Sequence, residues 1–365
     1  WGVNINKGKS IYVKYRPVMD GGAFVGMMLM LLYIGRRYYT NVIRRIFGLA
    51  AHDAIPESIT WWGRFAMLGG SVFVVTLKVL GLGFFDAVLY LLVLLTFFVI
   101  MSRILAETGM FFIQPDWWPS ALLVALLGPS FFGAGPLLLL FIVGNVFIMG
   151  SRETFMPYLL NNLAVAEKHD LTPGKSAGYG LFGVILAFLI ALPVTLSAQY
   201  RFGVNFRDGW GAKAIPALPY ENAAPLFDHL KVLDKFQFMP DPLQRWLQIA
   251  PIDSGYWLWF LAGAVLVIGV SLLRIYIPRW PLHPVIFLVW FSTPVNHFAG
   301  SFLLGWFIKK MIMHYGGARV WQRIKPFFFG LIAGEIAAAF LAIVAGWLYY
   351  FIAHARPAYF NIFPA

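Results

Sequence analysis

The sequence has no cysteine, and only 12% of its 365 residues are charged. Without cysteine there are no disulfides, no thiolate metal sites and no cysteine nucleophile. Soluble domains carry about 25% charged residues, so this composition argues against a soluble protein. The Walker and HExxH motifs are also missing. We therefore expect that the protein is not an enzyme, and we expect no cofactor and no metal.

Hydrophobic residues make up 60% of the chain, and they gather in long uninterrupted runs. A helix needs roughly 20 apolar residues to cross the hydrocarbon of a bilayer. A transmembrane β-barrel would instead show short alternating segments, which are absent. The sequence predicts an all-α, polytopic transmembrane helix bundle with six full spans, at residues 18–35, 65–81, 85–102, 177–197, 255–275 and 327–352.

Two further apolar regions are interrupted by residues that break helices. Residues 119–149 contain Gly128-Pro129 and a second glycine and proline cluster at 133–136, and residues 283–308 contain the sequence STPVN at 292–296. We expect both regions to be broken helices or re-entrant hairpins. Broken helices expose backbone groups at mid-depth and are typical of transporter binding sites, although proline and glycine also simply kink packed helices.

The formal net charge is +12, and most basic residues lie beside the apolar runs. This distribution fits the excess of Lys and Arg in cytoplasmic loops, so we expect a lipid bilayer as partner and no nucleic acid. With both broken regions as hairpins, the termini face outward from a cell (inner) membrane. Residues 151–176 then form a cytoplasmic interfacial helix, and residues 199–253 form an extracytoplasmic cap. The first residue is not Met, and we expect 1–365 to be one transmembrane domain from a longer chain.

Glu335 is the first candidate for a proton or cation site. It lies in an apolar span, where a lone carboxylate is costly unless it is protonated or partnered. The alternative is a structural role, in which Glu335 is neutral or hydrogen-bonded to a neighbouring helix. Gly330 and Gly334 form a GxxxG pair, which favours close helix packing and supports that alternative.

Four other residues are candidates for substrate or ion binding. Asn296 and His297 follow the break in the second interrupted region, and Asn145 has a comparable place in the first. The alternative is that they cap broken helix ends. Glu107 lies four residues after Arg103, so on a helix the two form an ion pair at the membrane edge.

Three stretches carry a resemblance to known proteins: SRILAETG from Ser102, MPYLLNNLAVAEKHDLTPGK from Met156, and the chain from His283 through Glu335. They resemble the C-terminal half of a family of large polytopic bacterial and archaeal membrane proteins of unknown function, which is distantly similar to oligopeptide transporters. Glu107 and Gly109 match a motif of that family, whereas Thr108 departs from it.

The leading hypothesis is a secondary transporter of the oligopeptide-transporter-like type, for small peptides or metal chelates, coupled to protons through a buried carboxylate. The alternative is a non-catalytic scaffold or accessory subunit of a larger membrane complex. That alternative would bring other membrane subunits, or further copies of this chain, as partners.

Overall fold

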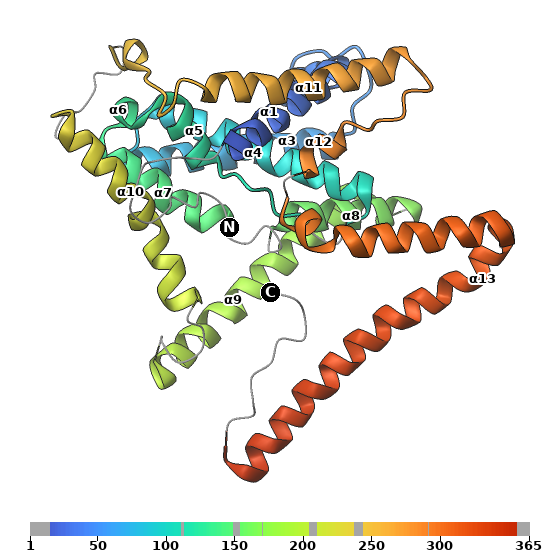
Figure 1. The fold of residues 1–365 in the computed structure, drawn as a ribbon. Helices are drawn as coiled ribbons and strands as arrows, with labels where there is room; N and C mark the ends of the chain where they lie inside the picture. The colour runs from blue at the N-terminus through green and yellow to red at the C-terminus, as the bar shows by residue number, and fades with distance from the viewer. Residues whose placement is uncertain are drawn as a thin grey trace. The chain divides into compact units, whose positions relative to one another are not determined.

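A computed structural model describes residues 15–110, 113–148, 154–169, 171–203, 210–236, 244–290 and 292–355 (Figure 1). The described residues contain helices and no strand. The long helices are α1 (Tyr15–Ile34), α3 (Glu57–Val79), α4 (Phe84–Thr108), α9 (Pro173–Phe202), α11 (Tyr256–Tyr276) and α13 (Thr293–Ala353). The shorter ones are α2 (Arg36–Ile46), α5 (Pro119–Leu127), α6 (Pro129–Phe132), α7 (Ala134–Ile148), α8 (Phe155–Lys168), α10 (Ile215–Val232), α12 (Val285–Val289), η3 (Trp210–Ala214) and η4 (Gln244–Gln248).

Six helices in the described part of the chain are long and apolar enough to cross a membrane: α1, α3, α4, α9, α11 and α13. They coincide with the six spans that the sequence predicts, so the all-α, membrane-protein prediction is confirmed. Helix ends differ by several residues. α3, for example, begins at Glu57 rather than at residue 65, because the polar start of a helix carries little hydrophobic signal.

The chain forms two compact units, Trp1–Asn296 and His297–Ala365, each described here by itself. The core of the first unit lies where α1, α4, α5 and α7 meet, next to the segment that precedes α5. Trp117 in that segment is 1% exposed. Its ring packs edge-on against Phe24 of α1 and Phe97 of α4, with ring centroids 5.2 Å away in both cases.

Helices α1 and α11 pack closely because glycines line their contact. A Cβ on Gly22 would overlap the carbonyl oxygen of Phe260, and a Cβ on Gly263 would overlap that of Met19. Small residues are the usual means by which transmembrane helices approach one another. This contact places α1 deep in the unit, with its central residues buried.

The first interrupted region is a helical hairpin, as predicted. Gly128 and Gly133 adopt positive φ angles of 87° and 78° and separate α5, α6 and α7. Ser120 near the start of α5 faces Gly144 near the end of α7, so the two helices run antiparallel. All residues from Pro119 to Phe132 are buried.

The second interrupted region breaks where predicted, between α12 and α13, but its hairpin form is not observed. Beyond the break α13 continues past residue 308, and its helical geometry is interrupted only at Gly317, which has φ 67° and ψ −177°. Figure 1 shows α13 as two helical arms joined by a sharp bend. The reason is that no glycine or proline pair follows the break until Gly316-Gly317, so the helix has no local signal to turn back.

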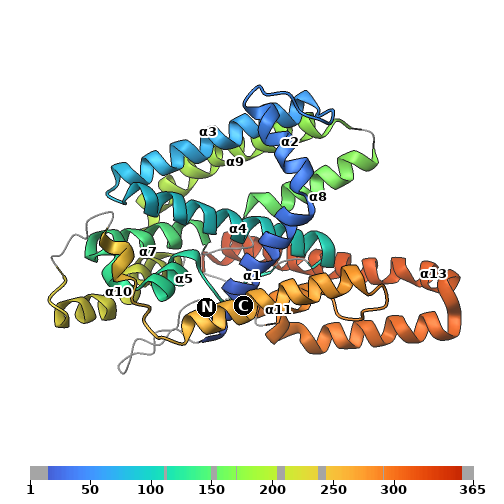
Figure 2. The ribbon, with the colours of Figure 1, turned by 90° about the horizontal axis from the view of Figure 1, so that it is seen from above.

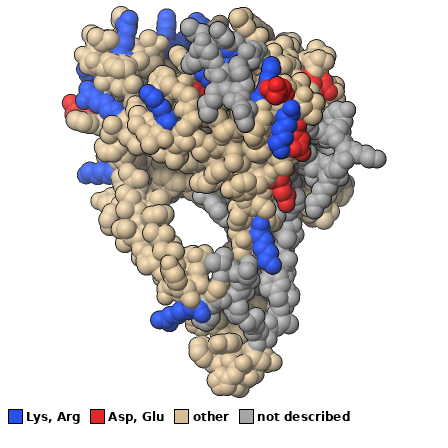
Figure 3. All heavy atoms as spheres, turned by 90° about the vertical axis from the view of Figure 1, so that its left-hand side faces the viewer, with Lys and Arg blue, Asp and Glu red and all other residues tan. Residues whose placement is uncertain are grey.

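Residues 151–176, predicted as an interfacial helix, contain α8 and the start of α9, and α8 packs against α4 and α9. Residues 199–253, predicted as an outside cap, contain the end of α9, η3, α10 and η4. In Figure 2, α3 and α9 run beside one another with α2 and α8 near their ends. Figure 3 shows Lys and Arg side chains among broad uncharged areas, with fewer Asp and Glu on that face. The membrane side of each segment stays a prediction.

Candidate functional site

The break after α5 is satisfied by the chain itself. The last four carbonyl groups of a helix have no partner within that helix. Here the carbonyl oxygens of Ala125, Leu126 and Leu127 accept hydrogen bonds from Ile252 N, Trp257 Nε1 and Ala250 N at 3.1–3.2 Å, and that of Val124 accepts one from Gly128 N at 2.9 Å. This helix end therefore offers no free carbonyl to a cation, and the break at this point is structural.

Two buried hydroxyl groups meet at the opposite end of the hairpin. Tyr90 of α4 and Ser120 of α5 are both 0% exposed. A Cβ on Gly144 of α7 would overlap Ser120 Oγ and lie 3.9 Å from Tyr90 OH, so both hydroxyls face the same glycine. Neither has a hydrogen-bond partner among the described residues. An unpaired buried hydroxyl costs about 1–3 kcal/mol, which favours water or a ligand at this polar cluster.

Asn145 lies directly after Gly144 and is 8% exposed. Its Nδ2 donates a hydrogen bond of 2.9 Å to the carbonyl oxygen of Ile215, at the start of α10. Its Oδ1 has no partner in the described part of the chain. The Nδ2 side of the amide therefore joins α7 to α10, and the Oδ1 side is available to a hydrogen-bond donor.

Asp20 is the most deeply buried acidic side chain of the described residues, at 1% exposed, and it lies in the span α1. Asp116, just before α5, is close enough to repel it electrostatically. The backbone of Asp116 also approaches the carboxylate, yet among the described residues neither Asp20 oxygen has a partner of normal hydrogen-bond geometry. The Nε1 of Trp117, the residue after Asp116, is likewise buried and has no hydrogen-bond partner in the described part of the chain. A charged carboxylate in such surroundings is costly, so a bound proton or cation would stabilise the site.

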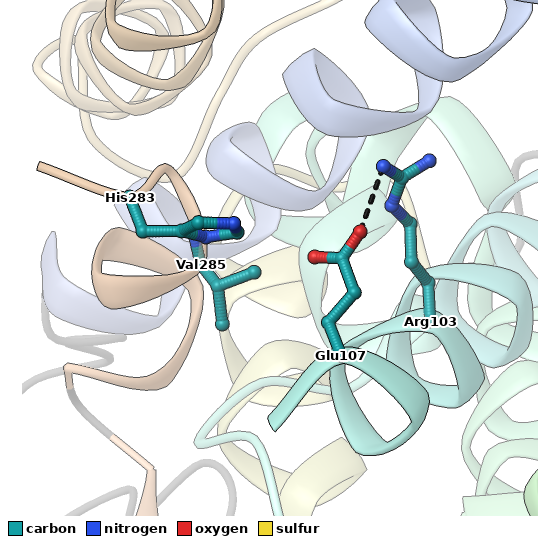
Figure 4. Close-up of polar contacts among 4 residues, drawn as sticks. All are labelled: Arg103, Glu107, His283 and Val285. Atoms are coloured by element: carbon teal, nitrogen blue, oxygen red, sulfur yellow. Dashed lines mark hydrogen bonds and ion pairs between the residues drawn. The ribbon is translucent and has the colours of Figure 1, made fainter. Parts of the chain in front are cut away.

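Glu107 forms the ion pair with Arg103 that the i, i+4 spacing predicts, with Oε1 2.8 Å from Nη2. Figure 4 shows the pair next to His283, which precedes α12. The Nδ1 of His283 accepts a 3.3 Å hydrogen bond from Val285 N. Partial burial, and then the charge of Arg274, lower the pKa of His283 below its ordinary value, while Glu107 opposes the shift. The imidazole is therefore neutral at pH 7.

Asp86 and Arg245 form the most buried ion pair of the described residues. Asp86 Oδ2 lies 2.6 Å from Arg245 Nη1, and the side chains are 3% and 7% exposed. The guanidinium also lies over the ring of Phe131 in α6, 5.1 Å from its centroid. Because every charge here has a partner, the pair ties the start of α4 to η4 and α6, and we assign it a structural role.

The remaining candidates lie at or beyond the boundary between the units. Glu335 is exposed on the second arm of α13, and His297 is exposed near the start of α13. The side chain of Asn296 lies outside the described residues. Asn145 and Glu107 have separate partners in the first unit, the carbonyl oxygen of Ile215 and the guanidinium of Arg103. No group of three or more His, Asp and Glu among the described residues is placed to hold a metal ion.

Residues 1–355 match the family of unknown function DUF6785. The chain belongs to this family. The match includes the first spans, ahead of the motifs from which the resemblance was inferred. No curated protein and no solved structure matches the chain, so the site in this DUF6785 member has to be argued from its own geometry.

Sequence reasoning missed Asp20, Tyr90, Ser120 and the Asp86–Arg245 pair. Asp20 had a usable signal, since it is the one acidic residue in the apolar run 18–35. It stands near the start of that run, where an acid is usually read as lying at the membrane surface. The hydroxyl groups of Tyr90 and Ser120 had no usable signal in the sequence, because Tyr and Ser are common in membrane spans. Asp86 and Arg245 are 159 residues apart, and only the fold brings them together.

Proposed function

We propose that the chain is a proton-coupled secondary transporter and that Asp20 carries the coupling proton. The observation that carries the proposal is the burial of this carboxyl group inside α1 with no hydrogen-bond partner among the described residues. Ionisable groups inside spans are expensive and mark proton or ion pathways. A proton taken up at Asp20 removes the cost, and its release restores it, so the occupancy of Asp20 favours one arrangement of the bundle over another.

The polar cluster formed by Tyr90, Ser120 and Asn145 supplies the second part of the proposal. These side chains lie on α4, α5 and α7, inside a hairpin whose helices are interrupted. Their unpaired oxygen atoms are suited to water or to the polar groups of a substrate. Resemblance to oligopeptide transporters suggests a small peptide or a metal chelate as that substrate. The proposed location is the inner membrane, with the termini of residues 1–365 outside.

Cysteine labelling tests for a water-filled path without knowledge of the substrate. The chain has no cysteine, so each introduced thiol is the only one. We expect Ser120→Cys to react with a membrane-impermeant methanethiosulfonate reagent in intact vesicles. The matched control is Ser102→Cys, because Ser102 is 2% exposed and its Oγ already donates to Phe98 O at 2.7 Å. If Ser120→Cys is as unreactive as the control, the interior is dry and the transporter proposal fails.

Flux through proteoliposomes tests the role of Asp20. The probes are trialanine for the peptide class and a ferric hydroxamate for the chelate class, each with an inward proton gradient. We expect Asp20→Asn to abolish gradient-driven accumulation while exchange of labelled for unlabelled substrate continues, since Asn keeps the shape but cannot carry a proton. Unchanged accumulation in Asp20→Asn would exclude Asp20 as the coupling residue.

A scaffold or accessory subunit is the second candidate, and α9 favours it. Every residue from Leu181 to Ser197 on this helix is exposed, and most are apolar. Lipid or another subunit would cover such a surface. Cross-linking in native membranes discriminates between them: photo-reactive residues at Leu189 and Phe188 label a protein partner in the scaffold case and lipid alone in the transporter case.

A further inference from the structure

A basic cavity lies beside α2, outside the apolar spans. Its volume is about 570 Å³, within the range of small-molecule sites. Helix α2 contributes Arg36, Arg37 and Arg44 to its wall, and the loop that follows contributes His52 and Asp53. Figure 2 shows α2 at the end of α1 and next to α3, both of which it contacts.

The loop side of the cavity is held in place by Asn41, which is 5% exposed. Its Nδ2 donates a 2.6 Å hydrogen bond to Asp53 Oδ2, and its Oδ1 accepts one of 3.3 Å from His52 N. The only acidic side chain of the wall is therefore engaged by a neutral amide rather than by an arginine. This leaves the wall preorganised and unbalanced in charge.

The arginines of the wall have no acidic partner among the described residues, where the ion pairs are Arg103–Glu107, Lys231–Asp228 and Arg245–Asp86. The guanidinium of Arg36 lies over the ring of Tyr33, 4.6 Å from its centroid, which restricts its position. The wall of the cavity thus contains three arginines and one aspartate. Such a set attracts a dianion or a phosphate ester, to which arginine binds through two parallel hydrogen bonds.

The position of the cavity along the chain restricts the class of ligand that it can bind. Only Gly35 separates α2 from the end of the span α1, so Arg36 and Arg37 follow directly after that span. Tyr38, Ile43 and Phe47 of the same segment are 48–63% exposed. Apolar residues beside arginines on one short helix are typical of segments that lie in the lipid headgroup layer.

We propose that the cavity beside α2 binds the phosphate headgroup of an anionic phospholipid. The phosphate lies among Arg36, Arg37 and Arg44, and the acyl chains leave the cavity along the exposed apolar residues of α2. This site is independent of the proposed transport activity. It does not require Asp20 or the polar cluster in the hairpin.

The test is native mass spectrometry of the full chain in detergent, titrated with phosphatidylglycerol and, separately, with phosphatidylcholine. We expect a retained phosphatidylglycerol and no retained phosphatidylcholine. Arg44→Gln should weaken the retained species about tenfold, the effect of losing one charge-assisted hydrogen-bonded contact. Arg45→Gln is the matched control, because it removes the same charge from the next residue of α2 but does not line this cavity. It should change binding by less than about twofold.

Three results would overturn the proposal. Equal losses in Arg44→Gln and Arg45→Gln would mean that the lipid responds to surface charge and not to the cavity. Equal retention of both lipids would remove the role of charge. Saturable binding of inorganic phosphate that displaces phosphatidylglycerol, with an affinity as high as that of the lipid, would assign the cavity to a soluble phosphate compound instead. A tryptophan-fluorescence melt without lipid checks that both variants are folded.

Discussion

Removing one partner of the buried pair Asp86–Arg245 should cost far more stability than removing one partner of the pair Arg103–Glu107. The N···O distances of the two pairs are nevertheless similar, at 2.6 and 2.8 Å. The difference lies in burial, since the first pair is 3% and 7% exposed and the second 29% and 33%. Removing one partner of a buried pair leaves an uncompensated charge and costs about 3–5 kcal/mol. An exposed i, i+4 pair is worth below about 1 kcal/mol.

Unfolding in mixed micelles, followed by the fluorescence of the 14 tryptophans, measures the free energies. We expect Asp86→Asn to destabilise the protein by about 3–5 kcal/mol, and Arg103→Gln by less than about 1 kcal/mol. The double variant Asp86→Asn with Arg245→Met should lose about 2 kcal/mol less unfolding free energy than the summed losses of the two single variants, because it buries no lone charge. Strict additivity, or equal effects of Asp86→Asn and Arg103→Gln, would refute the reasoning from burial.

Two further predictions concern helix packing and pH. Gly22→Ala should destabilise the protein by about 1–3 kcal/mol, because the new Cβ overlaps the carbonyl oxygen of Phe260. The control Gly69→Ala should be neutral or stabilising, because the space around Gly69 is open. Thermal melts compare the two variants. Because the pKa of His283 is lowered on folding, the unfolded chain binds more protons below about pH 6.5, so stability falls as pH falls through that value. His283→Gln should flatten this slope in melts recorded between pH 5 and 8, and an unchanged slope would exclude His283.

The helices themselves are largely predictable from the sequence, because long apolar runs have few alternatives to spanning a bilayer. The hairpin at 119–149 was also predictable, since Gly128-Pro129 and Gly133 stop a helix locally. The outcome at 283–308 differs because one break cannot make a hairpin. A return path needs a second stop, and the first one available is Gly317, which comes after Lys309 and Lys310.

Candidate sites are harder to predict, because their members are polar residues that the fold gathers from distant helices. Asn145 was predicted from its place in the first interrupted region, but it lies at the end of the hairpin opposite the break, and its partner Ile215 is 70 residues away. Ser120 and Tyr90 come together only because both side chains face Gly144, which has no side chain of its own. Glu335 stays a prediction, since the structure describes it as an exposed residue of the second unit.

Asp20 and Asp86 show why burial alone does not identify a working carboxylate. Both are acids near the start of an apolar helix, and both are almost inaccessible, at 1% and 3%. Arg245 pairs with Asp86 and balances its charge, whereas the charge that acts on Asp20 is that of another carboxylate, Asp116. A satisfied ion pair holds helices together and gains nothing from a proton at neutral pH. A carboxylate without a counter-charge is stabilised whenever a proton or cation binds, and this is the property that ion-coupled transport requires.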